Sequence, residues 1–264
     1  MKLLFALGAT CLLSLGLASS AINAGTGGNT AKTTEALSTN APDAQVALMN
    51  KMATLFRSAR KTVSENQGLI NDETKGDKGL NGKAVIAQTK ANFKSATGAD
   101  LAELDDSTLE GRAQAAMLRA IDETMTEAQP LINEQGKAFK GFLPAVFAKR
   151  VADGFSSHMK GSMFIKLTAP KSYVRNRANR PDSWEHEVIE TKFKSEGWAT
   201  GTEFIAAAPY KGKAAQRLLL PEYYSESCLK CHGGPKGERD ITGGKKEGGV
   251  LGELGGAISV GIYE

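Results

Sequence analysis

Apolar residues recur at spacings of three and four along the first 160 positions, and this pattern predicts long helices. The first helix follows Pro42-Asp43 with apolar positions at Leu48, Met52, Leu55, Ala59 and Val63. A second is expected to begin at the capping-box pattern Ser107-x-x-Glu110 and to end before Pro130. A third is expected from Ala145 to about Met159. We expect these apolar stripes to face a core.

The helical half contains an internal sequence repeat, in which similar short segments recur 62 residues later. The matching positions are Leu69-Ile70-Asn71 with Leu131-Ile132-Asn133, Lys78-Gly79 with Lys140-Gly141, and Phe93 with Phe155. One interpretation is a pair of related helix–loop–helix units made by duplication, and the other is a chance similarity between two helical stretches.

Beyond residue 160 the pattern changes to short apolar runs bounded by Gly and Pro, which is typical of strands. The expected strands are residues 163–168, 202–207, 217–220 and 257–263. Between the first two, Asp182 is expected to cap a helix that reaches about Ser195, with Glu185 completing a capping box. Helices followed by strands predict an α+β fold with a mostly antiparallel sheet.

The N-terminus has the layout of an export signal. A cationic Met1-Lys2 precedes the apolar run 3–17, and small residues follow, so residues 1–24 are predicted to be a signal peptide cleaved after Ala21 or Ala24. The alternative is a membrane anchor, but about fifteen apolar residues fall short of the roughly 20 that span a bilayer. We therefore expect a periplasmic protein without a membrane span after cleavage, with a linker at 25–41.

The mature chain has the composition of an ordinary globular protein. Removal of Lys2 leaves 32 basic against 29 acidic residues, a balance that does not suggest nucleic-acid binding. Cys11 would leave with the signal, so two cysteines remain. That count argues against a secreted scaffold stapled by several disulfides.

Both remaining cysteines belong to Cys228-Leu229-Lys230-Cys231-His232, the pattern of c-type haem attachment. The two thiols add across the haem vinyl groups, and the histidine supplies the proximal iron ligand. A zinc site would need further ligands from His158 or His186, and a thioredoxin-like pair is expected early in a βαβ pattern. We predict one covalently attached haem c, with a haem-free thiol or zinc module as the alternative.

The residues around this motif resemble the bacterial c-type haem PAS-like domain, which occurs as a periplasmic protein or as the sensor part of histidine kinases and chemotaxis receptors. The resemblance covers about residues 45–264 and rests on Phe164-Ile165-Lys166-Leu167, Arg175-Asn176, Arg180-Pro181-Asp182-Ser183-Trp184-Glu185, Tyr223 to Gly233, and Gly255 to Val260. It implies a PAS-like antiparallel sheet with long N-terminal helices, spanning residues 42–264 with a helical part at 42–160 and a sheet and haem part at 161–264. It also implies Cys228 and Cys231 as thioether sites and His232 as the proximal ligand.

The second axial position is where the chain departs from this family. A member can use a cysteine from its helical part there, and the mature chain has none to spare. The candidates are His158, Met159, Met163, His186, water, or no ligand at all. The basic cluster Arg175, Arg177 and Arg180 would either pair with haem propionates or form a solvated loop.

The expected function is redox or diatomic-ligand sensing, or electron transfer, at one haem without a transformed substrate. The partner would be a small diatomic ligand, a redox protein, or a separate signalling protein. A peroxidase-like oxidoreductase is the alternative, and it would need His158 as a distal proton-handling residue.

Overall fold

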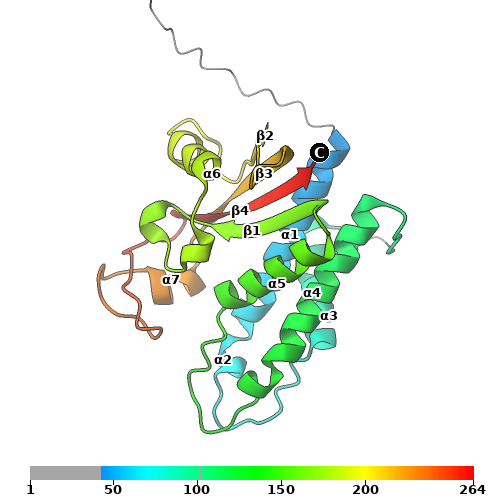
Figure 1. Ribbon diagram of the computed structural model, residues 1–264. Helices are drawn as coiled ribbons and strands as arrows, with labels where there is room; N and C mark the ends of the chain where they lie inside the picture. Colours follow the sequence, from blue (N-terminus) through cyan, green and yellow to red (C-terminus); the bar gives the residue numbers. More distant parts are fainter. Residues whose placement is uncertain (1–42, 102) are drawn as a thin grey trace, which may run out of the picture. The chain divides into compact units, whose positions relative to one another are not determined.

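The computed structural model describes residues 43–101 and 103–264, so the predicted signal peptide and linker lie outside the described residues. The first part is helical: α1 (Asp43–Glu65), α2 (Gln67–Ile70), α3 (Gly82–Thr97), α4 (Leu109–Ile132) and α5 (Pro144–His158). The second part carries β1 (Met163–Thr168), α6 (Ser183–Val188), β2 (Phe204–Ala207), β3 (Ala215–Tyr223), α7 (Glu226–His232) and β4 (Leu254–Tyr263). Figure 1 shows the helical bundle on one side of the sheet.

The four strands form one antiparallel sheet in the order β1-β4-β3-β2, which confirms the predicted α+β class. Met163 pairs with Ile262 at one end of β4, and Tyr223 pairs with Leu254 at the other. The C-terminal strand therefore lies inside the sheet, and its start adjoins the segment that leads into α7. None of the helices in the described part of the chain combines the length and apolar character of a membrane span.

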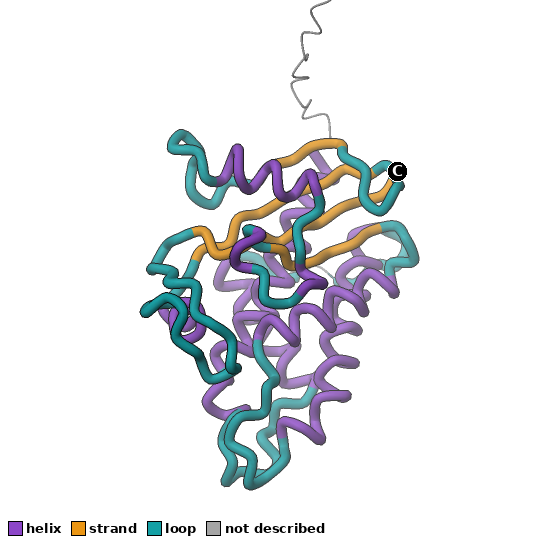
Figure 2. Tube along the Cα trace, turned by 60° about the vertical axis from the view of Figure 1, so that its left-hand side comes forward, coloured by secondary structure: helices purple, strands orange, loops and turns teal. Residues whose placement is uncertain are grey.

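Strand β4 is buried on both faces. Ile258 and Val260 join the large core shared with the helical bundle, while Ala257 belongs to a smaller apolar cluster under α6. Successive side chains of a strand point to opposite faces, so this alternation places the sheet between two layers. Figure 2 shows the strands between the bundle and the helical segment that contains α6.

The fully buried Arg217 anchors α6 to the sheet. Its guanidinium lies 2.8 Å from Asp182 and 3.0 Å from Glu185, and it stacks on the Trp184 ring at 4.3 Å. Asp182 accepts from the Glu185 N–H, and Glu185 accepts in return from the Asp182 N–H, so the predicted capping box is confirmed. A buried charge needs such partners, because an isolated one would be strongly destabilising.

The 62-residue repeat corresponds to two helix pairs, α1–α3 and α4–α5, joined by equivalent loops. Asn71 Oδ1 accepts from the Lys140 N–H at 3.0 Å, and Asn133 Oδ1 accepts from the Lys78 N–H at 3.2 Å. Each asparagine thus binds the loop of the other copy. This reciprocity supports the interpretation as two related helix–loop–helix units.

Two glutamines extend the same relation. Gln67 Nε2 donates to the Phe142 carbonyl at 3.0 Å, and Gln129 Nε2, 62 positions later, donates to the Leu80 carbonyl at 2.9 Å. These bonds satisfy carbonyls in the loops between the paired helices. The two copies are therefore interlocked at one end of the bundle.

The predicted start of the second helix is wrong in detail. The N-cap is Thr108, whose hydroxyl accepts from the Gly111 N–H at 3.0 Å, and Ser107 instead belongs to the preceding turn. Glu110 bonds to Gln114 and Lys51 rather than returning to a cap. A tertiary ion pair has replaced the local capping box.

The predicted end of the second helix is also corrected. α4 continues through Pro130 to the fully buried Ile132. A proline in the last turn removes only one helical hydrogen bond, and the burial of Ile132 offsets that loss. α6 ends at Val188 and continues as a π-helical turn, Ile189–Phe193, so the helical segment capped by Asp182 ends close to the predicted Ser195.

Candidate functional site

Helix α7 presents the three motif residues together. Cys228, Cys231 and His232 stand at positions i, i+3 and i+4, which share one face of a helix. The Cys228 N–H donates to the Ser225 carbonyl, and the Gly233 N–H donates to the Leu229 carbonyl, so both ends of this short helix are fixed. Both cysteines are free and partly exposed. The arrangement places two thiols and one imidazole within a single helical turn.

The His232 ring is held on two sides. Its Nδ1 lies 2.8 Å from Glu247 Oε2, and its plane stacks on Tyr224 with ring centroids 5.3 Å apart. A carboxylate partner keeps the proton on Nδ1 and leaves the Nε2 lone pair free for a metal. This is the state that a proximal ligand requires.

Arg175 holds Glu247 in place. Its Nε lies 2.6 Å from Glu247 Oε1 and its Nη2 lies 3.0 Å from Oε2, a bidentate contact. Burial alone would raise the pKa of Glu247, but the hydrogen bonds from Arg175 and His232 outweigh it and lower that pKa. Glu247 is therefore ionised near neutral pH.

Arg175 has further partners within the protein. It pairs with Asp240 and donates to the Cys231 carbonyl at 2.6 Å. These bonds engage the Arg175 guanidinium within the protein, and the pairing of the basic cluster with haem propionates stays a prediction. Arg175 instead ties the motif helix to the loop that follows it.

Glycines let that loop approach the motif closely. The Gly249 N–H donates to the His232 carbonyl at 2.8 Å. A Cβ added at Gly249 would lie 2.4 Å from the Tyr224 ring, and one at Gly255 would lie 2.3 Å from it. The Tyr224 ring therefore fits beside His232 only because these positions lack side chains.

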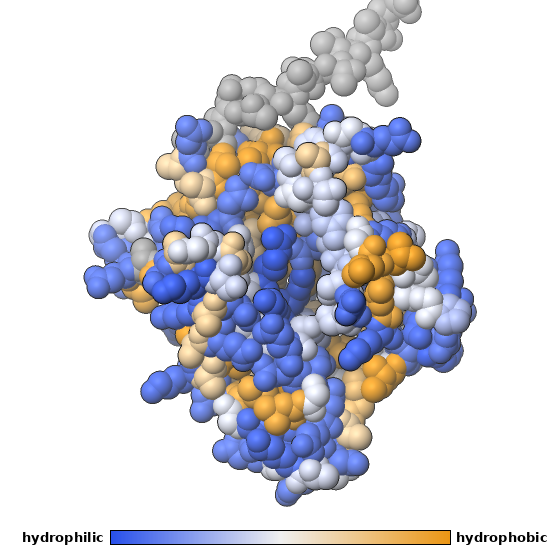
Figure 3. Space-filling model, turned by 180° about the vertical axis from the view of Figure 1, so that it is seen from behind, coloured by the Kyte–Doolittle hydropathy of each residue, from blue (hydrophilic) through white to orange (hydrophobic). Residues whose placement is uncertain are grey.

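Apolar side chains are exposed beside the motif. Of the described residues, the exposed large hydrophobic ones are Leu104, Ile241, Val250 and Leu251, and the last three lie in the loop after α7. Figure 3 shows apolar groups at the surface on the side that carries α7. Exposed apolar surface at a pair of free thiols fits a flat apolar group such as haem.

The alternative of a thioredoxin-like, redox-active cysteine pair finds little support in the environment of these thiols. Reactive cysteine pairs depend on a lowered thiol pKa. Here burial, with Asp240 adding to it, raises the pKa of the Cys231 thiol. No group of three or more His, Cys, Asp or Glu side chains forms a metal site within the described residues, so the zinc alternative has no ligand set there.

Three predicted distal ligands lie at the wrong end of the sheet. Met163 pairs with Ile262, whereas the strand end next to α7 pairs at Leu254. Those eight positions along β4 correspond to about 26 Å. His158 and Met159 lie near that far end, in a cleft that Ser162 also lines. A second ligand of an iron held by His232 would have to lie beside α7, and these three candidates do not lie there.

His158 has a different partner. Its Nε2 lies 2.7 Å from Glu123 Oε2, on the neighbouring helix α4. The peroxidase-like alternative loses its proton-handling residue with this placement. The fourth candidate, His186, lies on α6 with its Nδ1 3.9 Å from Glu190 Oε1 on the next turn.

Helix α1 contacts the start of the motif helix. Ser64 Oγ lies 3.5 Å from Ser227 Oγ at the start of α7. Arg57 and Arg60 both pair with Glu222, two residues before Tyr224. This face of α1 therefore brings hydroxyl and guanidinium groups to the site, and the methionines of α1, Met49 and Met52, are fully buried in the core.

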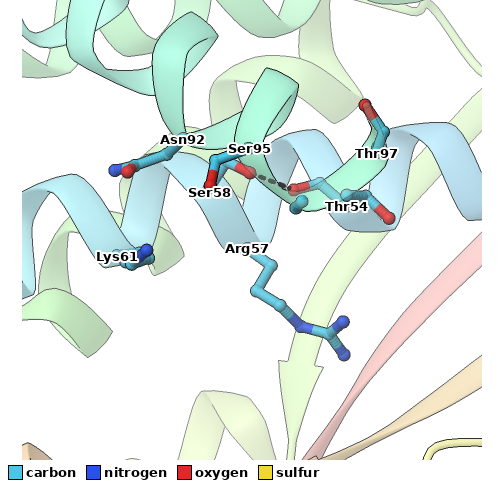
Figure 4. Close-up of a pocket in the computed structure, with 8 residues that line it drawn as sticks. Thr54, Arg57, Ser58, Lys61, Asn92, Ser95 and Thr97 are labelled. Atoms are coloured by element: carbon cyan, nitrogen blue, oxygen red, sulfur yellow. Dashed lines mark hydrogen bonds between the residues drawn. The ribbon is translucent and has the colours of Figure 1, made fainter. Parts of the chain in front are cut away.

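A polar cleft of about 240 Å³ lies on the same helix. It is lined by Thr54, Arg57, Ser58, Lys61, Asn92, Ser95, Ala96 and Thr97, from α1 and α3. Figure 4 shows Arg57 extending away from the cleft toward the sheet, in keeping with its pairing to Glu222. The cleft borders the α1 face that contacts α7 but contains none of the motif residues.

Comparison with known protein families gives a match over most of the chain. The model of the Tll0287-like family, described as Tll0287, matches residues 50–262, which is most of the chain and includes both the bundle and the motif. No curated protein and no solved structure matches.

Proposed function

Because the chain belongs to the Tll0287-like family, a family of haem-binding type, we propose that it carries one haem covalently attached at Cys228 and Cys231. His232 is the proximal iron ligand. The observation that carries this proposal is the geometry of α7: two free thiols and an imidazole share one helix face, and Glu247 leaves the imidazole Nε2 available.

The favoured role is sensing of redox state or of a diatomic ligand. A bound haem supplies one-electron chemistry and, where the sixth iron position is open, a site for O₂, NO or CO. Three of the protein ligands predicted for that position lie far along the sheet. The α1 side chains that reach α7 and its flanking strand, Ser64, Arg57 and Arg60, are not ligands of the His, Met or Cys type. These placements favour an iron that is open to a small ligand.

Electron transfer is the second candidate. It is favoured by the surface position of the motif, since Cys228, Cys231 and His232 are all partly exposed and Val250 and Leu251 stand at the surface beside them. A haem edge near solvent permits rapid exchange with a redox protein. Periplasmic location, cleavage after Ala21 or Ala24, and a separate signalling or redox partner are parts of the same proposal.

Expression with the c-type maturation machinery tests the proposal. We expect haem that survives denaturing electrophoresis, and its loss in the variant C228S/C231S. Protein without covalent haem would refute the assignment. The ferrous spectrum with and without CO then separates the two roles: a CO-induced shift supports ligand sensing, and an unchanged six-coordinate spectrum favours electron transfer.

A further inference from the structure

We propose that Glu247 is a positioning residue that lowers the reduction potential of the iron through its hydrogen bond with His232, and that Arg175 moderates this effect. The inference rests on the proposed haem attachment and deepens it. It assigns the control of the proximal ligand to a carboxylate and a guanidinium that the attachment motif does not contain.

The geometry leaves the Glu247 carboxylate little freedom. Its side chain is 8 % exposed, and Oε2 lies 2.8 Å from His232 Nδ1 and 3.0 Å from Arg175 Nη2. Its other oxygen lies 2.6 Å from Arg175 Nε. Both oxygens are thus committed to partners, and the carboxylate is fixed in the direction of the imidazole N–H.

A fixed carboxylate changes what the imidazole donates. A hydrogen bond from Nδ1–H to an anion increases the negative charge on the ring and makes Nε2 a stronger donor to a metal. A stronger donor stabilises the oxidised form of iron more than the reduced form, so the potential falls. A neutral acceptor at the same distance would have a smaller effect.

Arg175 acts in the opposite direction. It shares the carboxylate with His232, and its positive charge draws electron density away from the bond to the imidazole. Removal of the guanidinium should therefore strengthen the effect of Glu247. Replacing Glu247 and replacing Arg175 should therefore shift the reduction potential in opposite directions. A general loosening of the loop would not produce opposite shifts.

The experiment uses the holoprotein with its covalent haem content measured first. We expect E247Q to raise the midpoint potential and to lower the iron–histidine stretching frequency of the ferrous protein in resonance Raman spectra. The matched control is E253Q. Glu253 belongs to the same loop and carries the same charge, but it bonds Tyr173 and the Val250 N–H instead of His232. The midpoint potential of E253Q should shift less than that of E247Q, and the iron–histidine band of E253Q should stay at the wild-type frequency.

Two further variants complete the test. R175Q is expected to lower the midpoint potential. E247D keeps the negative charge on a shorter side chain, and its midpoint potential is expected to lie between those of the wild type and E247Q. Equal shifts in E247Q and E253Q, an unmoved iron–histidine band in E247Q, or a shift of the same sign in R175Q would overturn the inference. If E247Q does not retain haem, an E247D potential at or below the wild-type value overturns it instead. Absence of covalent haem in the wild-type protein would refute the proposed function rather than this inference.

Discussion

The two helix pairs share one architecture but have different neighbours. Arg57 on α1 reaches Glu222 at the end of β3, while Arg119, its counterpart 62 residues later on α4, pairs with Glu123 on its own helix. Only the first copy is thereby tied to the strand that leads into α7. The comparison shows that two equivalent helix pairs differ in their neighbours, and that this ion pair reaches the strand before α7 from the first pair.

The same comparison explains why two of the candidate distal ligands, His158 and Met159, lie away from the motif. His158 and Met159 line a cleft against α4, and the positions equivalent to them in the first copy, Ala96 and Thr97, line the cleft against α1. The copy that adjoins the motif therefore carries no metal-ligating side chain at these two positions. Candidate ligands of suitable chemistry were present, but in the copy that lies away from the motif.

Truncation of the equivalent phenylalanines should give the largest effect. Phe155 is fully buried and Phe93 is 3 % exposed, so each change to alanine should cost about 3–5 kcal/mol of unfolding free energy. F155A should cost more, because α5 packs on β1 as well as on helices, whereas α3 packs mainly on α1 and α4. Urea denaturation measures both, and an F93A loss larger than that of F155A would contradict this view.

The reciprocal asparagines test how symmetric the interlock is. N71A and N133A each leave one backbone N–H without its acceptor, in the loop of the other copy. We expect each to cost about 1–2 kcal/mol, with a difference below about 1 kcal/mol. A large cost from only one of them, measured in the same denaturation experiment, would show that the two loops are not equivalent.

The smallest effects should come from the equivalent arginines. R57Q should destabilise by about 1 kcal/mol, because Glu222 is mostly buried and loses one of its two partners. R119Q should change stability by less than about 0.5 kcal/mol, since it removes an exposed pair within one helix. In the holoprotein, only R57Q is expected to alter the haem absorption spectrum. An equal spectral change in R119Q would contradict the view that only the first helix pair is coupled to the motif.

The attachment residues could be predicted because their chemistry is local. Cys228, Cys231 and His232 lie within five positions, and any helical turn brings them together. Glu247 lies fifteen positions after His232 and Arg175 lies 57 before it, and no spacing rule connects them. Their roles follow from the folding of a glycine-rich loop onto α7, which depends on contacts that a pattern of residue types does not contain.

By itself, the sequence determined the features that arise between residues close in the chain: the helical stripes, the capping box at Asp182, the 62-residue repeat and the motif on α7. Only the tertiary structure decided which copy of the repeat adjoins that motif, because the register of β4 separates Met163 from Leu254 by most of a strand length. It also decided that Glu247 faces His232, since that contact needs the loop to return to the helix it leaves. Short-range preferences act before the chain is folded, and long-range contacts exist only once the sheet has fixed where each segment lies.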